Sequence, residues 1–333
     1  MLIYNNNCLQ QIKATIPAQI SNSCPSKLYL DITEDCNLHC IMCRDKIQIN
    51  NKVMKRELFN RIIEEVSWGV TSYSLFNWGE PLLVNDFKER VEFLVKKKLD
   101  QAVIDISTNG MLLNRTMTDF LLEKDVQVTV SFDADEKNVF ENIRKGSNFD
   151  IIKRNIEYLT KRSQQKNLFR TPGIYISIQK ANWNNILNIF KSAYSYGIVR
   201  IGMGLVINPE EFRPDFHEDL ISSLNDAMHY AQIHNIIVDL YPTKVGNYYW
   251  DDTNYSLIEN IILMTTCDVT LNTASIGWNG NVYLCCNYGD IAGNINGNSF
   301  LEIWNSKKYD EFRRIINTDR MPERCKNCTW VNR

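Results

Sequence analysis

The chain has 333 residues, of which 44% are hydrophobic and 23% are charged, and its formal net charge is −2. This length allows one large domain or two unequal ones, and the near balance of charge argues against a dedicated nucleic-acid-binding protein. Because no apolar run approaches the ~20 residues of a membrane helix and residues 1–19 lack a signal-peptide pattern, we expect a cytoplasmic protein with neither a nucleic acid nor a membrane as its partner.

Strand and helix patterns alternate along the first two thirds of the chain, which is typical of βαβ units on a parallel sheet. Six such units are too few to close an eight-stranded barrel, so we predict an α/β fold with a partial (β/α)6 TIM-like barrel and a site at the C-terminal strand ends. The predicted strands are 28–33, 71–76, 102–107, 127–132, 174–179 and 200–206, and the predicted helices are 55–67, 85–98, 115–124, 149–162 and 183–196.

The last third changes character. A helix is predicted over 217–234, Asn279-Gly280 signals a hairpin, and 299–316 is predicted as one amphipathic helix. We divide the chain into an N-terminal extension (1–27), the barrel (28–235) and a linker with a small C-terminal domain (236–333). An aromatic loop in the linker either stacks on a substrate ring or packs the barrel against the small domain; it contains Tyr241, Tyr248, Tyr249, Trp250 and Tyr255.

Cysteine placement carries the chemistry, because ten cysteines in a reducing compartment are more often metal ligands or catalytic groups than disulfides. Cys36, Cys40 and Cys43 form a Cys-x3-Cys-x2-Cys loop directly after the first predicted strand. A zinc site normally closes with four protein ligands, whereas three thiolates leave one iron of a [4Fe–4S] cluster open. The alternative is a zinc site with a distant fourth ligand such as His39.

This loop, placed after the first strand of a partial barrel, resembles that of radical S-adenosylmethionine (SAM) enzymes. The resemblance implies that the open iron binds the amino and carboxylate groups of SAM. An electron, supplied by a donor such as flavodoxin or ferredoxin, then breaks SAM to a 5′-deoxyadenosyl radical that takes a hydrogen atom from the substrate. Met42 stands where the family usually has an aromatic residue that packs near the adenine.

Other stretches match the same family in the expected order. Gly79-Glu80-Pro81 resembles its Gly-Gly-Glu-Pro turn, with Trp78 in place of the first glycine. The resemblance implies that Glu80 accepts a hydrogen bond from the SAM amino group and that Gly79 lets the backbone approach. Further implied SAM contacts are Ser107, Asn109, Ser131, Asp133 at the ribose, Arg144 at the carboxylate and Gln179, with Asn182 and Met203 as weaker candidates; the alternative is ordinary polar capping of strand and helix ends.

A second cysteine set lies near the C-terminus. Cys267, Cys285, Cys325 and Cys328 resemble the opening of the SPASM domain, in its shorter twitch form with one auxiliary [4Fe–4S] cluster. A cluster whose four irons are all ligated by cysteine is implied to transfer electrons and not to hold substrate. The alternative for these four cysteines is a zinc site. Cys286 is surplus and is either a hydrogen-atom donor or a small buried residue; Cys8 and Cys24 are expected to be small buried residues.

The substrate is less defined than the chemistry. Only 27 residues precede the first predicted strand, which favours a small molecule, such as a sugar or amino-alcohol, undergoing dehydrogenation or epimerisation. The second hypothesis is a maturase that introduces a crosslink or a D-residue into a ribosomal precursor peptide. The third, from another class, is a zinc-binding interaction protein.

Overall fold

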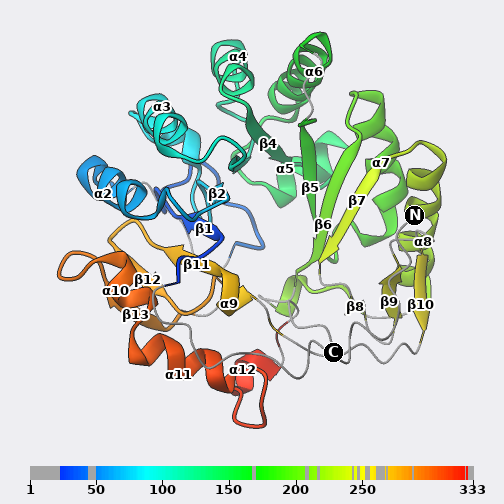
Figure 1. Cartoon of the computed structure of the whole chain (residues 1–333). Coiled ribbons are helices and arrows are strands. Elements are labelled where there is room, and N and C mark those ends of the chain that lie inside the picture. The colour runs from blue at the N-terminus through cyan, green and yellow to red at the C-terminus, as the bar shows by residue number, and fades with distance from the viewer. Residues whose placement is uncertain are drawn as a thin grey trace.

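The computed structural model describes residues 23–43, 50–166, 170–206, 210–215, 218–241, 244–245, 248–251, 256–259, 267, 269–286, 289–326 and 328. Its main feature is a curved sheet whose central strands all run parallel and which does not close into a barrel (Figure 1). This confirms the predicted partial barrel. The parallel strands are, in spatial order, β11 (Thr273–Ile276), β1 (Lys27–Leu30), β2 (Ser72–Ser74), β3 (Val103–Thr108), β4 (Val126–Ser131), β5 (Gly173–Ile178), β6 (Arg200–Leu205) and β7 (Ile237–Tyr241).

Helices cover the convex side of this sheet (Figure 1). Each predicted helix of the barrel is present within a few residues of its expected bounds, and α5 is an additional short helix before the Arg144 segment. The helices are α2 (Arg56–Val66), α3 (Phe87–Lys97), α4 (Arg115–Glu123), α5 (Lys137–Ile143), α6 (Phe149–Gln165), α7 (Ile186–Ser195) and α8 (Glu218–Ile233).

Strand alternation separates the two faces of the sheet. In β3, Ile104 and Ile106 are buried in the core, whereas Asp105 and Ser107 are only partly buried. The helices therefore cover the apolar face, and polar side chains remain for the concave face. Met203 on β6 is fully buried in the hydrophobic core, and its contact with SAM stays a prediction.

The C-terminal segment extends the same sheet. β11 pairs with β1 in parallel, and β12 (Asn281–Tyr283) and β13 (Ile291–Asn294) follow antiparallel. The predicted Asn279-Gly280 turn joins β11 to β12, with Gly280 at φ +84°, a backbone conformation that favours glycine. A separate three-stranded sheet contains β8 (Lys244–Val245), β9 (Tyr248–Asp251) and β10 (Ser256–Glu259).

The single helix predicted over 299–316 was wrong. The chain forms α10 (Phe300–Trp304) and α11 (Lys307–Ile315), because the Ser306 side chain accepts a hydrogen bond from the Tyr309 N–H at 3.3 Å and starts a new helix. The Asn305 side chain bonds the Ser23 carbonyl at 3.1 Å and fixes the break.

Some predictions concern residues outside the described part: the side chains of the aromatic loop, and Cys8. The proposed domain bounds at 27/28 and 235/236 stay predictions. Among the helices of the described residues, none has the length and apolar character needed to cross a membrane.

Candidate functional site

The three-cysteine loop follows β1 at the carboxyl ends of the parallel strands, which together are called the C-terminal edge of the sheet. Its backbone is tied to the end of α5, since the His39 N–H donates to the Lys145 carbonyl at 2.8 Å and the Ile41 N–H donates to the Ile143 carbonyl at 2.9 Å. Cys36, Cys40 and Cys43 are all partly exposed. The fold therefore presents three soft sulfur donors from one short loop.

Polar hydrogens surround these sulfurs. Cys36 Sγ accepts from the Leu38 N–H at 3.5 Å and from Asn109 Nδ2 at 3.8 Å, and Arg144 Nη1 lies 3.8 Å from Cys40 Sγ. Burial raises the pKa of Cys36 to about 11 and also raises the pKa of Cys40, against the opposing charge of Arg144. Because iron–sulfur proteins stabilise thiolate-bound clusters with such donors, this loop fits the predicted cluster.

The zinc alternative for this loop named His39 as a distant fourth ligand. His39 is exposed. Across the part of the chain that the structure describes, no group of three or more His, Cys, Asp or Glu side chains comes close enough together to hold a single metal ion.

Glu80 ties the end of β2 to the end of β3. It precedes the short 3-10 helix η1 (Pro81–Leu83), and its buried carboxylate accepts from the Leu82 N–H (3.1 Å), Thr108 Oγ1 (2.8 Å) and the Asn109 N–H (2.7 Å). Burial raises the pKa of Glu80 to about 7, although these hydrogen bonds oppose the rise. A carboxylate this desolvated has a strong affinity for an additional cation.

Gly79 has a local reason for its identity. A Cβ atom there would lie 2.2 Å from the Thr33 carbonyl oxygen and 2.7 Å from that of Asp35, just before the cysteine loop. The glycine therefore allows the Glu80 turn to pack directly against the segment that leads into the cysteines.

Asp133 and Arg144 form a buried ion pair. Arg144 Nε lies 2.8 Å from Asp133 Oδ2, and Asp133 Oδ1 also accepts from the Ser177 N–H at 2.7 Å. Burial raises the pKa of Asp133, while the charge of Arg144 opposes that rise. The aspartate thus holds the guanidinium against the cysteine loop, a pairing that the sequence prediction of separate ribose and carboxylate contacts did not include.

The remaining predicted residues lie along the same edge. Asn109 Nδ2 donates to Asn37 Oδ1 at 2.7 Å. Within the described part of the chain, the side-chain oxygen of the fully buried Gln179 has no hydrogen-bond partner. Asn182 Nδ2 donates to the Asp133 carbonyl at 2.8 Å. Met42, Ser107 and Ser131 are partly buried at this edge, and their contact with SAM stays a prediction.

Sequence reasoning missed two polar features. The first is a pair of supporting side chains: Thr108 donates to Glu80, and Asn37 accepts from Asn109. Only their adjacency to the motifs could have indicated them.

The second is Asp105, which lies on the same strand face as Ser107. It accepts from Ser74 Oγ at 3.0 and 2.9 Å, and burial raises its pKa. An isolated aspartate in an alternating strand gives no such signal, because it is also what a solvent-facing position contains.

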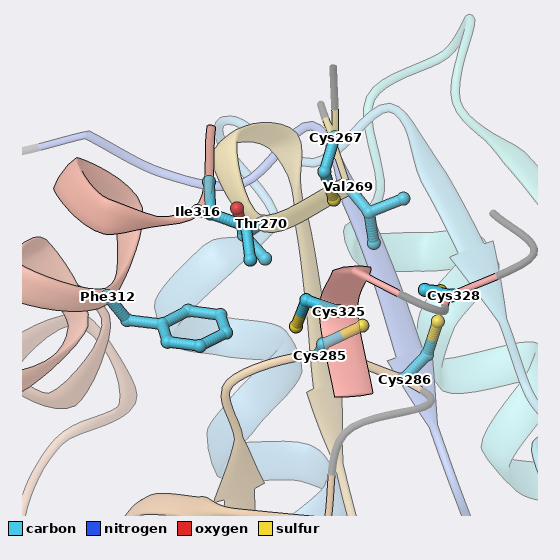
Figure 2. A pocket seen from close by; sticks show the side chains of 9 residues that line it. All are labelled: Cys267, Val269, Thr270, Cys285, Cys286, Phe312, Ile316, Cys325 and Cys328. Atoms are coloured by element: carbon cyan, nitrogen blue, oxygen red, sulfur yellow. The ribbon is translucent and has the colours of Figure 1, made fainter. Parts of the chain in front are cut away.

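The second cysteine set surrounds one cavity (Figure 2). Cys267 precedes the short helix α9 (Val269–Asn272), Cys285 and Cys286 follow β12, and Cys325 lies in α12 (Glu323–Lys326) with Cys328 just beyond. The other residues that line this cavity are Val269, Thr270, Phe312 and Ile316. The structure thus brings together four cysteines that are up to 61 residues apart in the chain (328 − 267), as the sequence predicted.

Burial dominates the thiols of this cavity. It raises the pKa of Cys325 to about 11 and also raises the pKa of Cys267, whose sulfur accepts from the Val269 and Thr270 N–H groups. Such thiols are protonated at neutral pH and release protons on binding a thiophilic metal. An apolar, sulfur-rich cavity with backbone donors fits a cluster fully ligated by protein.

The two surplus cysteines differ. Cys286 lines the cavity beside Cys285 and is close enough to Tyr29 on β1 to add to the rise that burial causes in the pKa of Tyr29. Cys24 packs near Gly69, with its sulfur 3.8 Å from the Val66 carbonyl oxygen. Cys24 was expected to be buried, and the structure leaves it partly exposed beside α2.

Two family models match the chain: the radical SAM superfamily over residues 30–176 and the SPASM iron-sulfur cluster-binding domain over residues 267–329. Among curated proteins, the radical SAM cyclopropyl synthase TigE of Paramaledivibacter caminithermalis is 27% identical over 91% of this chain and 66% of its own length. The GTP 3′,8-cyclase of Clostridium acetobutylicum is 31% identical over 39% of this chain and 41% of its own. The chain thus spans less than two thirds of either relative.

Three solved structures share the fold. Streptococcus suis SuiB bound to precursor peptide SuiA superposes with a TM-score of 0.67 at 15% identity, covering 92% of this chain and 70% of that one. The enzyme anSMEcpe with bound SAM and the Cp18Cys peptide gives 0.63 at 19% identity, covering 91% and 86%. BtrN in complex with SAM and 2-DOIA gives 0.53 at 17% identity, covering 92% and 94%.

Proposed function

Because the chain belongs to the radical SAM superfamily and carries a SPASM-type iron–sulfur domain, we propose that it is an enzyme that cleaves SAM reductively and removes a hydrogen atom from a substrate. The observation that carries this proposal is the convergence of the three-cysteine loop with Glu80 and Arg144 at one sheet edge. When bound, the site-differentiated [4Fe–4S] cluster and SAM supply an electron and a 5′-deoxyadenosyl radical.

The protein residues then have distinct tasks. Cys36, Cys40 and Cys43 ligate three irons, and Arg144 places a buried positive charge beside the thiolates and toward the SAM carboxylate. Glu80 receives the SAM ammonium, since a carboxylate with a pKa near 7 gains most from a cation that restores its charge. Met42, Gly79, Ser107, Asn109, Ser131, Asp133 and Gln179 complete the proposed SAM site.

For the second set we propose one auxiliary [4Fe–4S] cluster ligated by Cys267, Cys285, Cys325 and Cys328. In an oxidation, the substrate loses a hydrogen atom to the radical, giving 5′-deoxyadenosine, and then loses one electron and one proton. The cluster that Cys267, Cys285, Cys325 and Cys328 would hold would accept this electron, because ligation by four cysteines leaves no iron free to bind substrate.

For the substrate we favour a peptide over a small molecule. The solved structures with peptides, SuiB and anSMEcpe, superpose more closely than BtrN, whose complex contains 2-DOIA, with TM-scores of 0.67 and 0.63 against 0.53. The small-molecule hypothesis, which the sequence favoured, becomes the second candidate, and it is supported by the similar lengths of this chain and BtrN, each covered above 90% by the other.

The test is release of 5′-deoxyadenosine by anaerobically reconstituted, reduced protein. Extract from deuterium-labelled host cells is divided by a small-molecule filter, and each fraction is added separately. We expect the retained fraction to stimulate the reaction and deuterium to appear in 5′-deoxyadenosine. Stimulation by the filtrate alone would replace the peptide with a small molecule, and no cleavage with any reductant would reject the radical mechanism. The matched control is the Cys36→Ala/Cys40→Ala/Cys43→Ala variant.

Cys286 is relevant only if the reaction is an epimerisation. In that case its thiol returns a hydrogen atom to the substrate radical, and the resulting thiyl radical takes up one electron, supplied by an external donor such as flavodoxin or ferredoxin, and one proton from water. Cys286→Ala would then abolish the epimer while SAM cleavage continues. Normal product formation by this variant excludes the donor role.

A further inference from the structure

Helix α11 forms one wall of the auxiliary cavity. Phe312 and Ile316 line the cavity directly (Figure 2), and Arg313 lies between them in sequence with only 7% of its surface exposed. A buried arginine beside an apolar, sulfur-lined cavity is unusual, because burying a charge is costly unless something compensates for it.

The surroundings of Arg313 contain aromatic rings and a carbonyl. Its guanidinium carbon lies 4.0 Å from the ring centre of Trp304 and 4.3 Å from that of Tyr309, and Nε donates to the Thr270 carbonyl at 3.2 Å. Its Nη2 is buried and has no hydrogen-bond partner among the residues that the structure describes. Cation–π contacts offset part of the desolvation cost, and they leave the positive charge in place.

Among the described residues, no carboxylate lies within ion-pair distance of Arg313, although the charge of Asp310 opposes the fall in the pKa of Arg313. Asp310, one turn earlier on the same helix, lies 2.8 Å from the neighbouring Arg314 and pairs with it. Burial lowers the pKa of Arg313, yet an arginine stays protonated throughout the physiological range. A permanent positive charge therefore lies behind the cavity lining, bonded to Thr270, and its carboxylate neighbour Asp310 is paired with Arg314 instead.

The contacts of Arg313 lead to two of the proposed ligands. Thr270, which accepts from Arg313, lines the cavity, and its own N–H donates to the Cys267 sulfur. Tyr309, stacked on Arg313, donates from its hydroxyl to the Tyr283 carbonyl at 3.3 Å, two residues before Cys285. One side chain thus supports the segments on which both cysteines depend.

We propose that Arg313 is a positioning residue of the auxiliary cluster, which fixes the Cys267 segment and whose buried charge raises the reduction potential of the cluster. A [4Fe–4S] cluster with four thiolates is anionic, and reduction adds one more electron. A buried cation stabilises the reduced form more than the oxidised form, and salt screens it little. This inference depends on the auxiliary cluster and not on the identity of the substrate.

The experiment measures the potential directly, without substrate. The Cys36→Ala/Cys40→Ala/Cys43→Ala protein serves as the background, so that only the auxiliary cluster titrates. In it we compare Arg313→Gln with Arg314→Gln, which removes the same charge one residue away at a largely exposed position. The readouts are iron and sulfide per chain and the midpoint potential from an EPR-monitored redox titration at low and high salt.

We expect Arg313→Gln to lower the one-electron equilibrium constant for reduction about tenfold, which is 59 mV, at both salt concentrations. Arg314→Gln is expected to change it less than twofold. Equal midpoints for the two variants would overturn the proposal. A partly loaded variant is still informative, because the midpoint is measured on the loaded fraction. If Arg313→Gln binds no cluster, Arg313→Lys replaces it in the test. An equilibrium constant for reduction within twofold of the background protein supports the charge effect, and a tenfold decrease in that constant rejects it.

Discussion

The two cysteine sets use the same sulfur ligands in opposite environments. The loop of Cys36, Cys40 and Cys43 lies beside the buried Asp133–Arg144 ion pair, whereas the C-terminal cavity is lined by cysteines, Thr270 and three apolar side chains. In the proposed function, three cysteines of the first set would leave one iron open for SAM, whereas four cysteines of the second set would ligate every iron of their cluster. In that proposal, the polar surroundings, more than the sulfurs, would distinguish the first set as the SAM site from the second set as the electron carrier.

Removing either cysteine set should give the largest effects, and they should differ in kind. We expect Cys36→Ala/Cys40→Ala/Cys43→Ala to reduce 5′-deoxyadenosine formation to background, because the cluster that reduces SAM is lost. Cys267→Ala/Cys285→Ala should lose about four irons per chain but keep SAM cleavage while forming no product. Iron analysis and chromatography of 5′-deoxyadenosine measure both. Cys24→Ala is the control, and loss of SAM cleavage in the C-terminal variant would contradict the division of labour.

Asp133→Asn tests how much the buried ion pair between Asp133 and Arg144 contributes to the free energy of unfolding. It leaves the Arg144 guanidinium buried without its carboxylate, and breaking such a pair costs about 3–5 kcal/mol of unfolding free energy. Urea denaturation of the apoprotein measures the loss. Asp135→Asn, two residues along and partly exposed, should cost far less. Similar losses in the two variants would mean that the ion pair is not a structural unit of the site.

Local patterns predicted the fold well and the site only in part. The six predicted strands lie within about three residues of the observed ends, because β-branched alternation is a local property. The break at Asn305-Ser306 was missed because the apolar spacing continues through it, and the contact that fixes it joins Asn305 to Ser23, 282 residues away. Likewise, the sequence identified Asp133 and Arg144 as polar candidates, but only the packing of β4, β5 and α5 makes them partners.

Glu80 should make the stability of the first region depend on pH. Its pKa rises from 4.5 to about 7 on folding, so the folded state holds a proton that the unfolded state releases between these values. The contribution of Glu80 is therefore fully present below pH 4.5 and is lost as the pH rises through 7, by about 3 kcal/mol at 1.36 kcal/mol per pKa unit. The difference in unfolding free energy between the parent and Glu80→Gln, measured in urea from pH 4.5 to 8, should show this slope.

Two outcomes of that titration are informative. A flat difference would mean that the hydrogen bonds from Thr108 and Asn109 keep Glu80 ionised. With SAM bound to the cluster-loaded protein, the slope should decrease, because the ammonium group stabilises the carboxylate and lowers its pKa.

The smallest expected effect concerns the connection between the two regions. The Glu65 side chain on α2 accepts from the Phe300 N–H at 3.0 Å and the Leu301 N–H at 2.7 Å, at the start of α10, and so joins the barrel to the segment that leads to α11. Replacing the carboxylate by an amide in Glu65→Gln keeps one acceptor and removes the charge that the helix N-terminus favours, which should cost about 1 kcal/mol. Glu64→Gln, which removes an exposed ion pair with Lys97 at 3.1 Å, should cost less.

Hydrogen exchange of the α10 amides shows whether the two regions unfold separately or together. Faster exchange confined to the C-terminal segment in Glu65→Gln shows that the carboxylate connects two separable regions. Equal acceleration across α2 and the barrel strands would show instead that the two cysteine sets belong to one cooperative unit, which the shared pairing of β1 with β11 also permits.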